Sequence, residues 1–228
     1  MNNEKPISAE NVQVQRPPAF MPAILKLVLF GILIIAAAVL VWHGFVKDRV
    51  IPRRFGEVEK GLIYRSGRIS AGLIKKTLVK YNIGVIVDLT AEDDKIADQN
   101  AERKAAAELN IKRLVLPLRG NGTGDINNYA SAVAAIAEAK HANMPILVHC
   151  ALGSQRTGGV IAAYQLLVEQ KAPSLVLKEL KHYGWETEDT DLLTYLNSNM
   201  KRLSELLYQM HVIERIPSPL PQLPQEEK

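Results

Sequence analysis

The sequence predicts an α/β fold in which a central, mainly parallel sheet is flanked by helices and preceded by a single transmembrane helix. Two short apolar runs rich in β-branched residues, 83–89 and 145–149, are typical of strands that are buried on both faces. Segments of helical composition alternate with such runs, which implies right-handed crossovers between parallel strands. A separate apolar run of 20 residues, 27–46, contains no acidic or basic residue except His43.

The apolar run 27–46 has the length of a membrane span, since about 20 residues at about 1.5 Å rise cover about 30 Å. Trp42 and Phe45 suit one membrane interface, and Lys26 can extend to the headgroups at the other. We therefore interpret residues 23–46 as a single-pass anchor. A cleaved signal peptide should have a shorter apolar region followed by a small-x-small cleavage site. A buried core helix is the other alternative.

The orientation of this anchor depends on the positive charges that flank it. The residues on the N-terminal side are Lys5, Arg16 and Lys26, and those on the C-terminal side are Lys47, Arg49, Arg53, Arg54 and Lys60. The richer flank lies in the cytoplasm by the positive-inside rule, so we expect a cytoplasmic catalytic domain. An exported, periplasmic domain is the alternative, because the N-terminal amine adds to the shorter count.

The two ends of the chain predict tails rather than folded segments. Residues 1–22 are polar, contain prolines and predict a mobile N-terminal tail. Residues 214–228 carry four prolines and show neither helical nor strand period, which predicts a proline-rich disordered tail. The segment between anchor and tail, 55–213, has about 160 residues and is long enough for one autonomous core.

Within 55–213 the elements follow one another in a regular order. Residues 55–64 alternate around Glu59-Lys60-Gly61 and predict a hairpin, and Ser70 is placed to cap a helix that ends near Tyr81. Strands are predicted at 83–89, 112–117 and 145–149, and helices at 93–109 and 128–140. A glycine-rich loop, 120–125, precedes the second of these helices, and a further helix begins at Arg156.

Charge and cysteine content exclude several classes of protein. The chain has 228 residues, with 28 Lys and Arg against 24 Asp and Glu, so its formal net charge is +4. This excess is too small and too evenly spread to indicate a nucleic-acid-binding protein. Cys150 is the sole cysteine, which excludes an intrachain disulfide framework and a zinc cluster built on several thiolates.

Cys150 follows directly after a predicted strand and starts a short loop that leads into a helix. Ligands bind at the carboxyl ends of strands in such sheets. The backbone N–H groups of this loop can turn inward and, with the positive end of the helix dipole, form a cradle for an oxyanion. The same field favours thiolate over thiol, so Cys150 is a candidate nucleophile. The cradle residues are Ala151, Leu152, Gly153, Ser154, Gln155 and Arg156.

Two side chains at the helix start suit a reaction at phosphorus. Arg156 can return its planar fork to hold two phosphoryl oxygens bidentately, which a lysine cannot copy. Thr157 is placed to donate a hydrogen bond to the sulfur when the thiolate becomes the leaving group. Arg65 and Arg119 are candidates for added positive charge near the cradle or for structural arginines.

The residues His149-Cys150, Gly153, Arg156 and Thr157 match the HCxxGxxR(S/T) signature of cysteine-dependent protein tyrosine and dual-specificity phosphatases. The segments 61–67 and 87–90 also resemble compact bacterial members of the dual-specificity type. The resemblance implies a dual-specificity phosphatase-like sheet and hydrolysis of phosphate monoesters through a cysteinyl-phosphate intermediate. It implies neither metal nor cofactor, and it places His149, Cys150, Arg156 and Thr157 among the catalytic residues.

One departure from the family pattern concerns the general acid. Members of the family usually carry an aspartate about thirty residues before the cysteine, and the segment 116–121 has no acidic residue here. Asp125, on the glycine-rich loop, is our candidate acid, because its loop can close over the substrate. The alternative is that Asp125 caps the helix that follows. The acids 92–94 indicate a capped helix start rather than a metal site.

Three function classes follow from these residues. The first is a metal-independent phosphomonoester hydrolase acting on a phosphorylated substrate, with a phosphoprotein favoured over a phospholipid or another phosphate ester. The cradle supplies no lysine of the kind expected for inositol phosphates. The second class is a catalytically weak phosphate-binding module, or pseudophosphatase, which the missing acid favours. The third is a rhodanese-like sulfurtransferase, against which Arg156-Thr157 argues.

Overall fold

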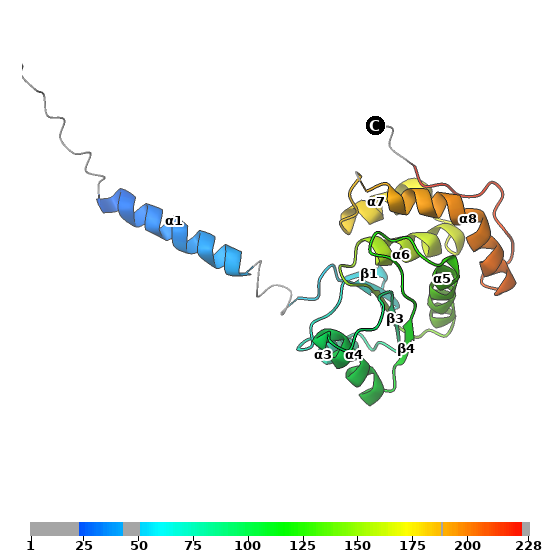
Figure 1. The fold of residues 1–228 in the computed structure, drawn as a ribbon, viewed down its shortest axis with the longest axis horizontal. Coiled ribbons are helices and arrows are strands. Elements are labelled where there is room, and N and C mark those ends of the chain that lie inside the picture. Colours follow the sequence, from blue (N-terminus) through cyan, green and yellow to red (C-terminus); the bar gives the residue numbers. More distant parts are fainter. Residues whose placement is uncertain (1–22, 43–50, 188, 225–228) are drawn as a thin grey trace, which may run out of the picture. The chain divides into compact units, whose positions relative to one another are not determined.

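The computed structural model describes residues 23–42, 51–187 and 189–224 of the chain. The predicted mobile tail 1–22, the predicted anchor end 43–46 and residues 225–228 lie outside the described residues. The chain divides into two compact units, Met1–Gly44 and Phe45–Lys228. The first contains α1 (Ala23–Val41), drawn in blue in Figure 1, which is exposed along its length. Within the described residues it is the one helix with the length and composition to cross a membrane.

The second unit is built on a five-stranded sheet. The strands are β1 (Gly56–Glu59), β2 (Ile63–Ser66), β3 (Val85–Asp88), β4 (Lys112–Val115) and β5 (Ile146–His149). Their order is β1-β2-β5-β3-β4, with β1 antiparallel to β2 and every other pair parallel. The predicted hairpin and the mainly parallel sheet are confirmed. β3, β4 and β5 are shorter than their predicted runs, whereas β2 extends to Ser66, beyond the predicted hairpin 55–64.

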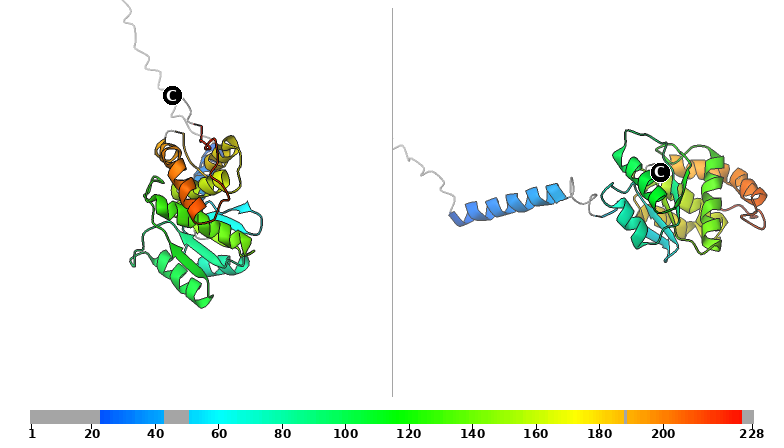
Figure 2. Two further views of the ribbon diagram at one scale, coloured as in Figure 1. Left: turned by 90° about the vertical axis from the view of Figure 1, so that its right-hand side faces the viewer. Right: turned by 90° about the horizontal axis from the view of Figure 1, so that it is seen from below.

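In the described part of this unit, six helices flank the sheet on its two faces (Figures 1 and 2). They are α3 (Ile74–Lys80), α4 (Ala97–Glu108), α5 (Ile126–His141), α6 (Gln155–Leu167), α7 (Pro173–His182) and α8 (Asp191–Gln209). Residues of α3 and α4 pack in one core cluster, and residues of the other four helices pack in a second, larger cluster. The architecture is therefore a sheet between two helical layers.

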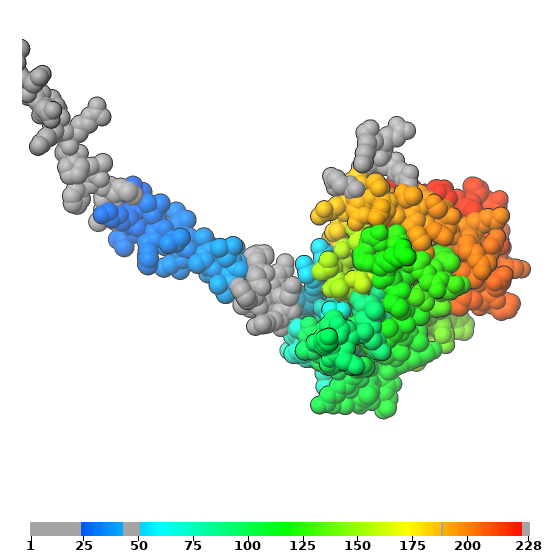
Figure 3. All heavy atoms as spheres, viewed as in Figure 1, coloured from blue at the N-terminus to red at the C-terminus, as the bar shows by residue number. Residues whose placement is uncertain are grey.

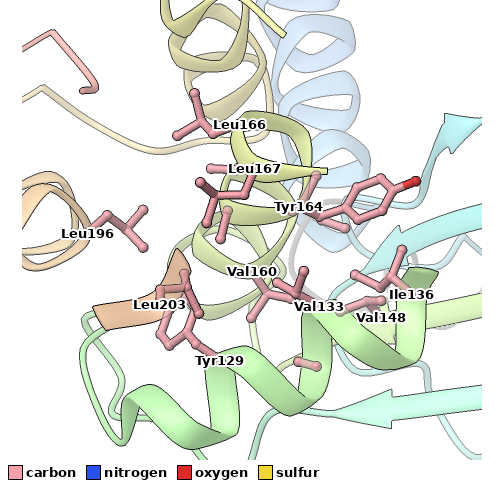
Figure 4. Packing of buried hydrophobic residues seen from close by; sticks show 14 of the residues in the cluster. Tyr129, Val133, Ile136, Val148, Val160, Tyr164, Leu166, Leu167, Leu196 and Leu203 are labelled. Atoms are coloured by element: carbon pink, nitrogen blue, oxygen red, sulfur yellow. The ribbon is translucent and has the colours of Figure 1, made fainter. Parts of the chain in front are cut away.

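The strand side chains alternate between these two clusters. Val85 and Val87 of β3 face the larger cluster, whereas Ile86 faces the smaller one. Ile146 and Val148 of β5 join the larger cluster, where Figure 4 shows Val148 beside Val133 and Ile136 of α5. Burial on both faces explains why these strands read as continuous apolar runs rather than as alternating ones.

Two helix starts differ from the prediction. Ser70 does not cap α3, which begins at Ile74; the carbonyl of Ser70 instead accepts the N–H groups of Leu73 and Ile74 at 2.9 and 3.0 Å. α4 begins at Ala97 rather than at residue 93. Asp93 forms a turn there, because its side chain accepts the N–H of Lys95 and its carbonyl accepts the N–H of Ile96. In both places a turn takes up the first residues of the predicted helix.

Part of the tail that the sequence predicts to be disordered packs on the domain through Leu220 and Leu223. Leu223 is 2% exposed, and its N–H and carbonyl both bond the side chain of Asn197 on α8, at 2.8 and 2.9 Å. Leu220 packs on the same core. The prolines remove backbone donors and so prevent a helix or strand, but the leucines between them bury apolar surface. Figure 3 shows this red segment against the orange surface of α8.

Candidate active site

Cys150 is the first residue after β5. The strand lies between β2 and β3, and its last residue, His149, is in register with Ser66 on β2 and with Asp88 on β3. The loop that starts at Cys150 therefore opens at the carboxyl ends of three parallel strands, where ligands of α/β proteins bind. Cys150 itself is 2% exposed.

The cysteine loop, residues 150–155, turns its carbonyl oxygens away from the sulfur. Successive carbonyls accept hydrogen bonds as follows: Ala151 from Arg68 N–H (3.2 Å), Leu152 from Arg54 Nη1 (2.9 Å), Gly153 from Arg65 Nη2 (2.9 Å) and Ser154 from Gly158 N–H (2.7 Å). In a trans peptide the carbonyl and the next N–H point in opposite directions. The N–H groups of 152–155 thus point to the other side, and that of Gly153 donates to Cys150 Sγ at 3.1 Å. An anion cradle needs this arrangement.

Glycine is required at position 153. Its φ is +80°, a conformation that side chains rarely adopt, and a Cβ there would lie 2.5 Å from the backbone nitrogen of Gly67. A Cβ on Gly67 would in turn lie 3.0 Å from the carbonyl of Leu152. The cysteine loop and the end of β2 therefore pack backbone against backbone, which fixes the curvature of the loop.

The sulfur of Cys150 lies in a field that favours thiolate. Burial by itself raises the pKa of Cys150, but hydrogen bonds from the Thr157 side chain, from the N–H groups of Thr157 and Gly153, and the charge of Arg156 outweigh burial. The pKa consequently lies below its ordinary value. The Thr157 hydroxyl is also 3.4 Å from the carbonyl of Ser66, a long contact that leaves its proton available to the sulfur.

Arg156 occupies the first turn of α6 with its side chain half-buried. Its Nε is buried, and the described part of the chain provides no acceptor for it. A guanidinium with an unpaired donor beside an anion cradle is suited to bind two oxygens of a phosphoryl group. The structure thus brings together all the predicted cradle residues, 151–156, with Cys150 and Thr157.

His149 belongs to a buried set of charged side chains behind the loop, which we call the His149 cluster: Asp88, Glu102, Arg113 and His149. Nε2 of His149 lies 2.9 Å from Glu102 Oε2, and both side chains are at most 3% exposed. Arg113 donates to Glu102 Oε1 at 2.8 Å and to Asp88 Oδ2 at 2.7 Å. Its third bond, at 2.6 Å, goes to the half-exposed Glu92.

These contacts shift the pKa values of the pair His149 and Glu102 in opposite directions. Burial lowers the pKa of His149, but the charge and hydrogen bond of Glu102, aided by Asp88 and Cys150, raise it to about 9. Burial raises the pKa of Glu102, but His149 and Arg113 lower it to about 2. The sequence predicts that His149 belongs to the site but does not indicate its acidic partner.

Asp88, Glu102 and His149 are also the described side chains that could hold a metal ion, because their ligand atoms lie within 4.8 Å of one another. The guanidinium of Arg113 already bonds both carboxylates. We therefore interpret the group as an ion network rather than as a metal centre. The acids at 92–94 do not assemble either: Glu92 pairs with Arg113 and Asp94 with Arg103.

Asp125 takes the structural role that the sequence left open. It is exposed and caps α5, with Oδ1 accepting the N–H of Asn127 at 2.9 Å. The glycine-rich loop before it lies against the start of α6, since a Cβ on Gly122 would be 3.3 Å from the carbonyl carbon of Gln155. Asp125 and Arg119 line an open hollow of about 500 Å³ whose lining includes no cradle residue. The acid therefore lies on the loop that neighbours the cradle.

Several residues of this site were not predicted, or only in part. Arg65 is 1% exposed and holds the loop as a structural arginine, with Glu179 at 3.4 Å and the Tyr183 ring at 3.9 Å. Arg54 was counted only as a charge flanking the anchor. Glu102 and Arg113 gave no signal, because an acid on an alanine-rich helix and an arginine in a strand read as surface charges.

Residues 66–182 match the family model for the catalytic domain of dual specificity phosphatases. A curated relative, the dual specificity protein phosphatase OPG106 of vaccinia virus (strain Copenhagen), is 39% identical over 75 residues, which are 32% of this chain and 43% of that protein. The match thus spans less than half the length of this relative.

Solved structures share the fold. P. aeruginosa TpbA is 22% identical, with a TM-score of 0.55, and the alignment covers 70% of this chain and 91% of that one. The core catalytic domain of the PP-IP phosphatase SIW14 from S. cerevisiae is 20% identical, with a TM-score of 0.54, covering 75% and 97%. The family model spans more than half of the chain and contains the whole cysteine loop, so the chain belongs to the dual specificity phosphatase catalytic domain family.

Proposed function

We propose that this chain is a phosphoric monoester hydrolase of the tyrosine and dual-specificity phosphatase type, with Cys150 as its nucleophile. The observation that carries the proposal is the cysteine loop, in which the carbonyls of Ala151 to Ser154 are all bonded while the N–H of Gly153 donates to the sulfur. Membership of the family supports the same reaction. The loop and the buried thiolate provide both the binding site and the nucleophile.

The reaction proceeds in two displacements at phosphorus. The phosphoryl oxygens bind the N–H groups of 152–155 and the fork of Arg156. The Cys150 thiolate attacks phosphorus, so that an S–P bond forms, the P–O bond to the leaving group breaks, and that oxygen receives a proton. Water then attacks the cysteinyl phosphate and gives a proton to the carboxylate that the first step left deprotonated. A P–O bond forms, the S–P bond breaks, and the sulfur leaves as a thiolate that Thr157 stabilises. Neither displacement requires a metal.

The proton for the leaving group comes from Asp125 in this proposal. Asp125 lies on the loop beside the start of α6, and its exposure leaves it open to a substrate. Its capping bond to Asn127 uses Oδ1 and leaves Oδ2 for a proton. The proposed role of Cys150 does not depend on that of Asp125, because capping α5 is by itself a sufficient reason for an aspartate at position 125.

The substrate that we favour is a phosphoprotein. A second solved structure of P. aeruginosa TpbA, 21% identical to this chain, is a complex with phosphotyrosine. SIW14 is instead named a PP-IP phosphatase. The cradle here carries Ala151, Leu152, Ser154 and Gln155, with no lysine to add charge for a multiply phosphorylated ligand. A phospholipid or another phosphate ester is the alternative substrate.

Residues 23–46 form a single-pass membrane anchor in this proposal, and the catalytic domain lies in the cytoplasm. The exposed apolar surface of α1 supports the anchor, and the positive charges that follow it support the orientation. Protease treatment of sealed vesicles tests both. A domain protected in right-side-out vesicles agrees with the cytoplasmic orientation, and a digested domain indicates export.

A pseudophosphatase is the second candidate, favoured by the capping role of Asp125. The rhodanese-like alternative lacks comparable support, because the family model matched is that of phosphatases. The deciding experiment measures release of nitrophenolate from p-nitrophenyl phosphate by the full chain in detergent. The phosphatase hydrolyses it with or without a chelator, and Cys150→Ser abolishes the activity. A wild-type chain that binds phosphate without turnover is a pseudophosphatase.

A further inference from the structure

The His149 cluster places four charged side chains directly behind the nucleophile. Asp88 ends β3, Glu102 lies on α4, Arg113 lies on β4 and His149 ends β5. Their side chains are between 0 and 10% exposed. His149 is the residue before Cys150, so the cluster is joined to the nucleophile by one peptide bond.

The charge balance of this cluster fixes the protonation state of His149. Asp88 and Glu102 bring two negative charges, and Arg113 brings one positive charge. An unbalanced charge is costly in a buried site, and the cost disappears if the imidazole also carries a positive charge. Glu92, which also bonds Arg113, is half-exposed, so solvent screens its charge.

The hydrogen bonds of the imidazole do not decide between its two states. Nε2 lies 2.9 Å from Glu102 Oε2 in an ion-pair contact, and neither ring nitrogen makes a hydrogen bond of good geometry in the part of the chain that the structure describes. Nδ1 would be an unpaired acceptor in the neutral ring and an unpaired donor in the charged one. The neutral and charged states of the imidazole therefore differ in charge balance, because only the charged ring compensates the negative charges of Glu102 and Asp88.

We propose that Glu102 is a positioning residue for catalysis, which keeps His149 as an imidazolium so that a fixed positive charge lies behind the Cys150 sulfur. Arg113 orients Glu102, and Asp88 anchors Arg113. The inference rests on the proposed function, because it takes Cys150 to react as a thiolate. From the front, the same sulfur faces Arg156, Thr157 and the N–H of Gly153.

The test measures the rate at which iodoacetamide alkylates the full chain in detergent as a function of pH. Cys150 is the sole cysteine, so every adduct reports this sulfur. Glu102→Gln should move the midpoint of the profile upward by about one pH unit, the low end for loss of a neighbouring charge, and lower the rate about tenfold below the midpoint. Glu92→Gln is the matched control, since it removes a carboxylate that bonds the same arginine, and it should leave the midpoint in place.

A double-mutant cycle separates this role from general loosening of the site. His149→Gln should raise the midpoint as Glu102→Gln does, and the double variant should equal His149→Gln alone. A Glu102→Gln effect that persists in full without His149 overturns the inference. If Glu102→Gln does not fold, the ¹⁵N shifts of His149 in the wild type decide, because an imidazolium at pH 7.5 supports the inference and a neutral ring contradicts it.

The outcomes for the inference and for the proposed function differ. A wild-type midpoint near 8.5, the value of an unperturbed thiol, removes Cys150 as an activated nucleophile and with it the proposed function. An acidic wild-type midpoint that Glu102→Gln leaves unchanged keeps the proposed function and rejects only the role of Glu102.

Discussion

Two loops meet at the carboxyl edge of the sheet, and they are held in different ways. The cysteine loop, 150–155, is fixed from outside, where the guanidinium groups of Arg54 and Arg65 bond two of its carbonyls. The glycine-rich loop, 120–125, lies on the connection from β4 to α5. Its carbonyls accept the hydroxyls of Tyr129 and Tyr195, at 2.5 and 2.8 Å.

The two modes of support lead to different chemistry. Charged donors bond two carbonyls of the cysteine loop, those of Leu152 and Gly153, which directs the N–H groups that follow them to the other side, where an anion can bind. Neutral hydroxyls bond the glycine-rich loop, whose acid, Asp125, bonds the N–H of Asn127. The first loop is therefore organised around a ligand. The second loop is organised to cap α5, the helix that follows it. A role in catalysis would be a second function of the same loop.

The largest effect is expected from Arg156→Lys, at the start of the helix that follows the cysteine loop. Lysine keeps the charge but loses the planar fork, so turnover of p-nitrophenyl phosphate should fall by roughly 100-fold or more, the cost of one oxyanion-stabilising group. Steady-state kinetics measure kcat and KM separately. Near-normal turnover in this variant would remove Arg156 from the mechanism and weaken the contrast between the loops.

Asp125 tests whether the glycine-rich loop takes part in catalysis. Asparagine caps helices as well as aspartate does but cannot donate the proton, so Asp125→Asn should retain stability. If Asp125 is the acid, the rate should fall for an alkyl phosphate and much less for an aryl phosphate, and their ratio should change by roughly 100-fold.

Asp125→Ala provides the matched comparison, because it removes the cap as well. It should lower the free energy of unfolding by about 1 kcal/mol relative to Asp125→Asn, with the same change in the substrate ratio. An unchanged ratio in both variants restricts Asp125 to its capping role.

A glycine in each loop provides the third test. Gly153→Ala forces a Cβ to 2.5 Å from the Gly67 nitrogen at a φ of +80°, and should cost about 1–3 kcal/mol of strain together with activity. Gly120→Ala, in the other loop, adds a Cβ with nothing within 4 Å and should leave stability unchanged. Thermal unfolding and turnover measure both. Equal effects of the two substitutions would contradict the rigid curvature that we assign to the cysteine loop.

The cysteine loop could be predicted from the sequence because its functional residues are consecutive. His149 to Thr157 supply the nucleophile, cradle and arginine within one strand-loop-helix unit, so no long-range contact had to be guessed. The sheet was predictable for a similar reason, since strands such as 85–88 and 146–149 are buried on both faces and read as apolar runs.

The supports of the loop could not be predicted, because they come from distant parts of the chain. Arg54 lies 98 residues before the carbonyl that it bonds, and Glu102 reaches His149 from another helix. Single charged residues in such positions look like solvent-exposed ones. Leu223 was missed in the same way, because the prolines around it suggested disorder and only the contact with Asn197 shows its place.

The sharpest contrast between the supports of the two loops is expected in the pH dependence of stability. The pKa of His149 rises from 6.5 to about 9 on folding, so its contribution is complete below about pH 6.5 and is lost as the pH rises to about 9. The pKa of Glu102 falls from 4.5 to about 2, so its contribution is complete above about pH 4.5 and is lost toward pH 2.

The ion network behind the cysteine loop should therefore stabilise the fold most between about pH 4.5 and 6.5. The difference in unfolding free energy between wild type and His149→Gln should shrink as the pH rises from about 6 to about 9. Tyr195→Phe removes a neutral hydrogen bond from the glycine-rich loop, and the pKa of Tyr195 is raised by burial, so its cost of about 1 kcal/mol should stay constant over the same range. Urea unfolding of the three proteins at several pH values measures both differences. A constant difference for His149→Gln would mean that the imidazole is neutral, and that the two loops rest on supports of the same kind.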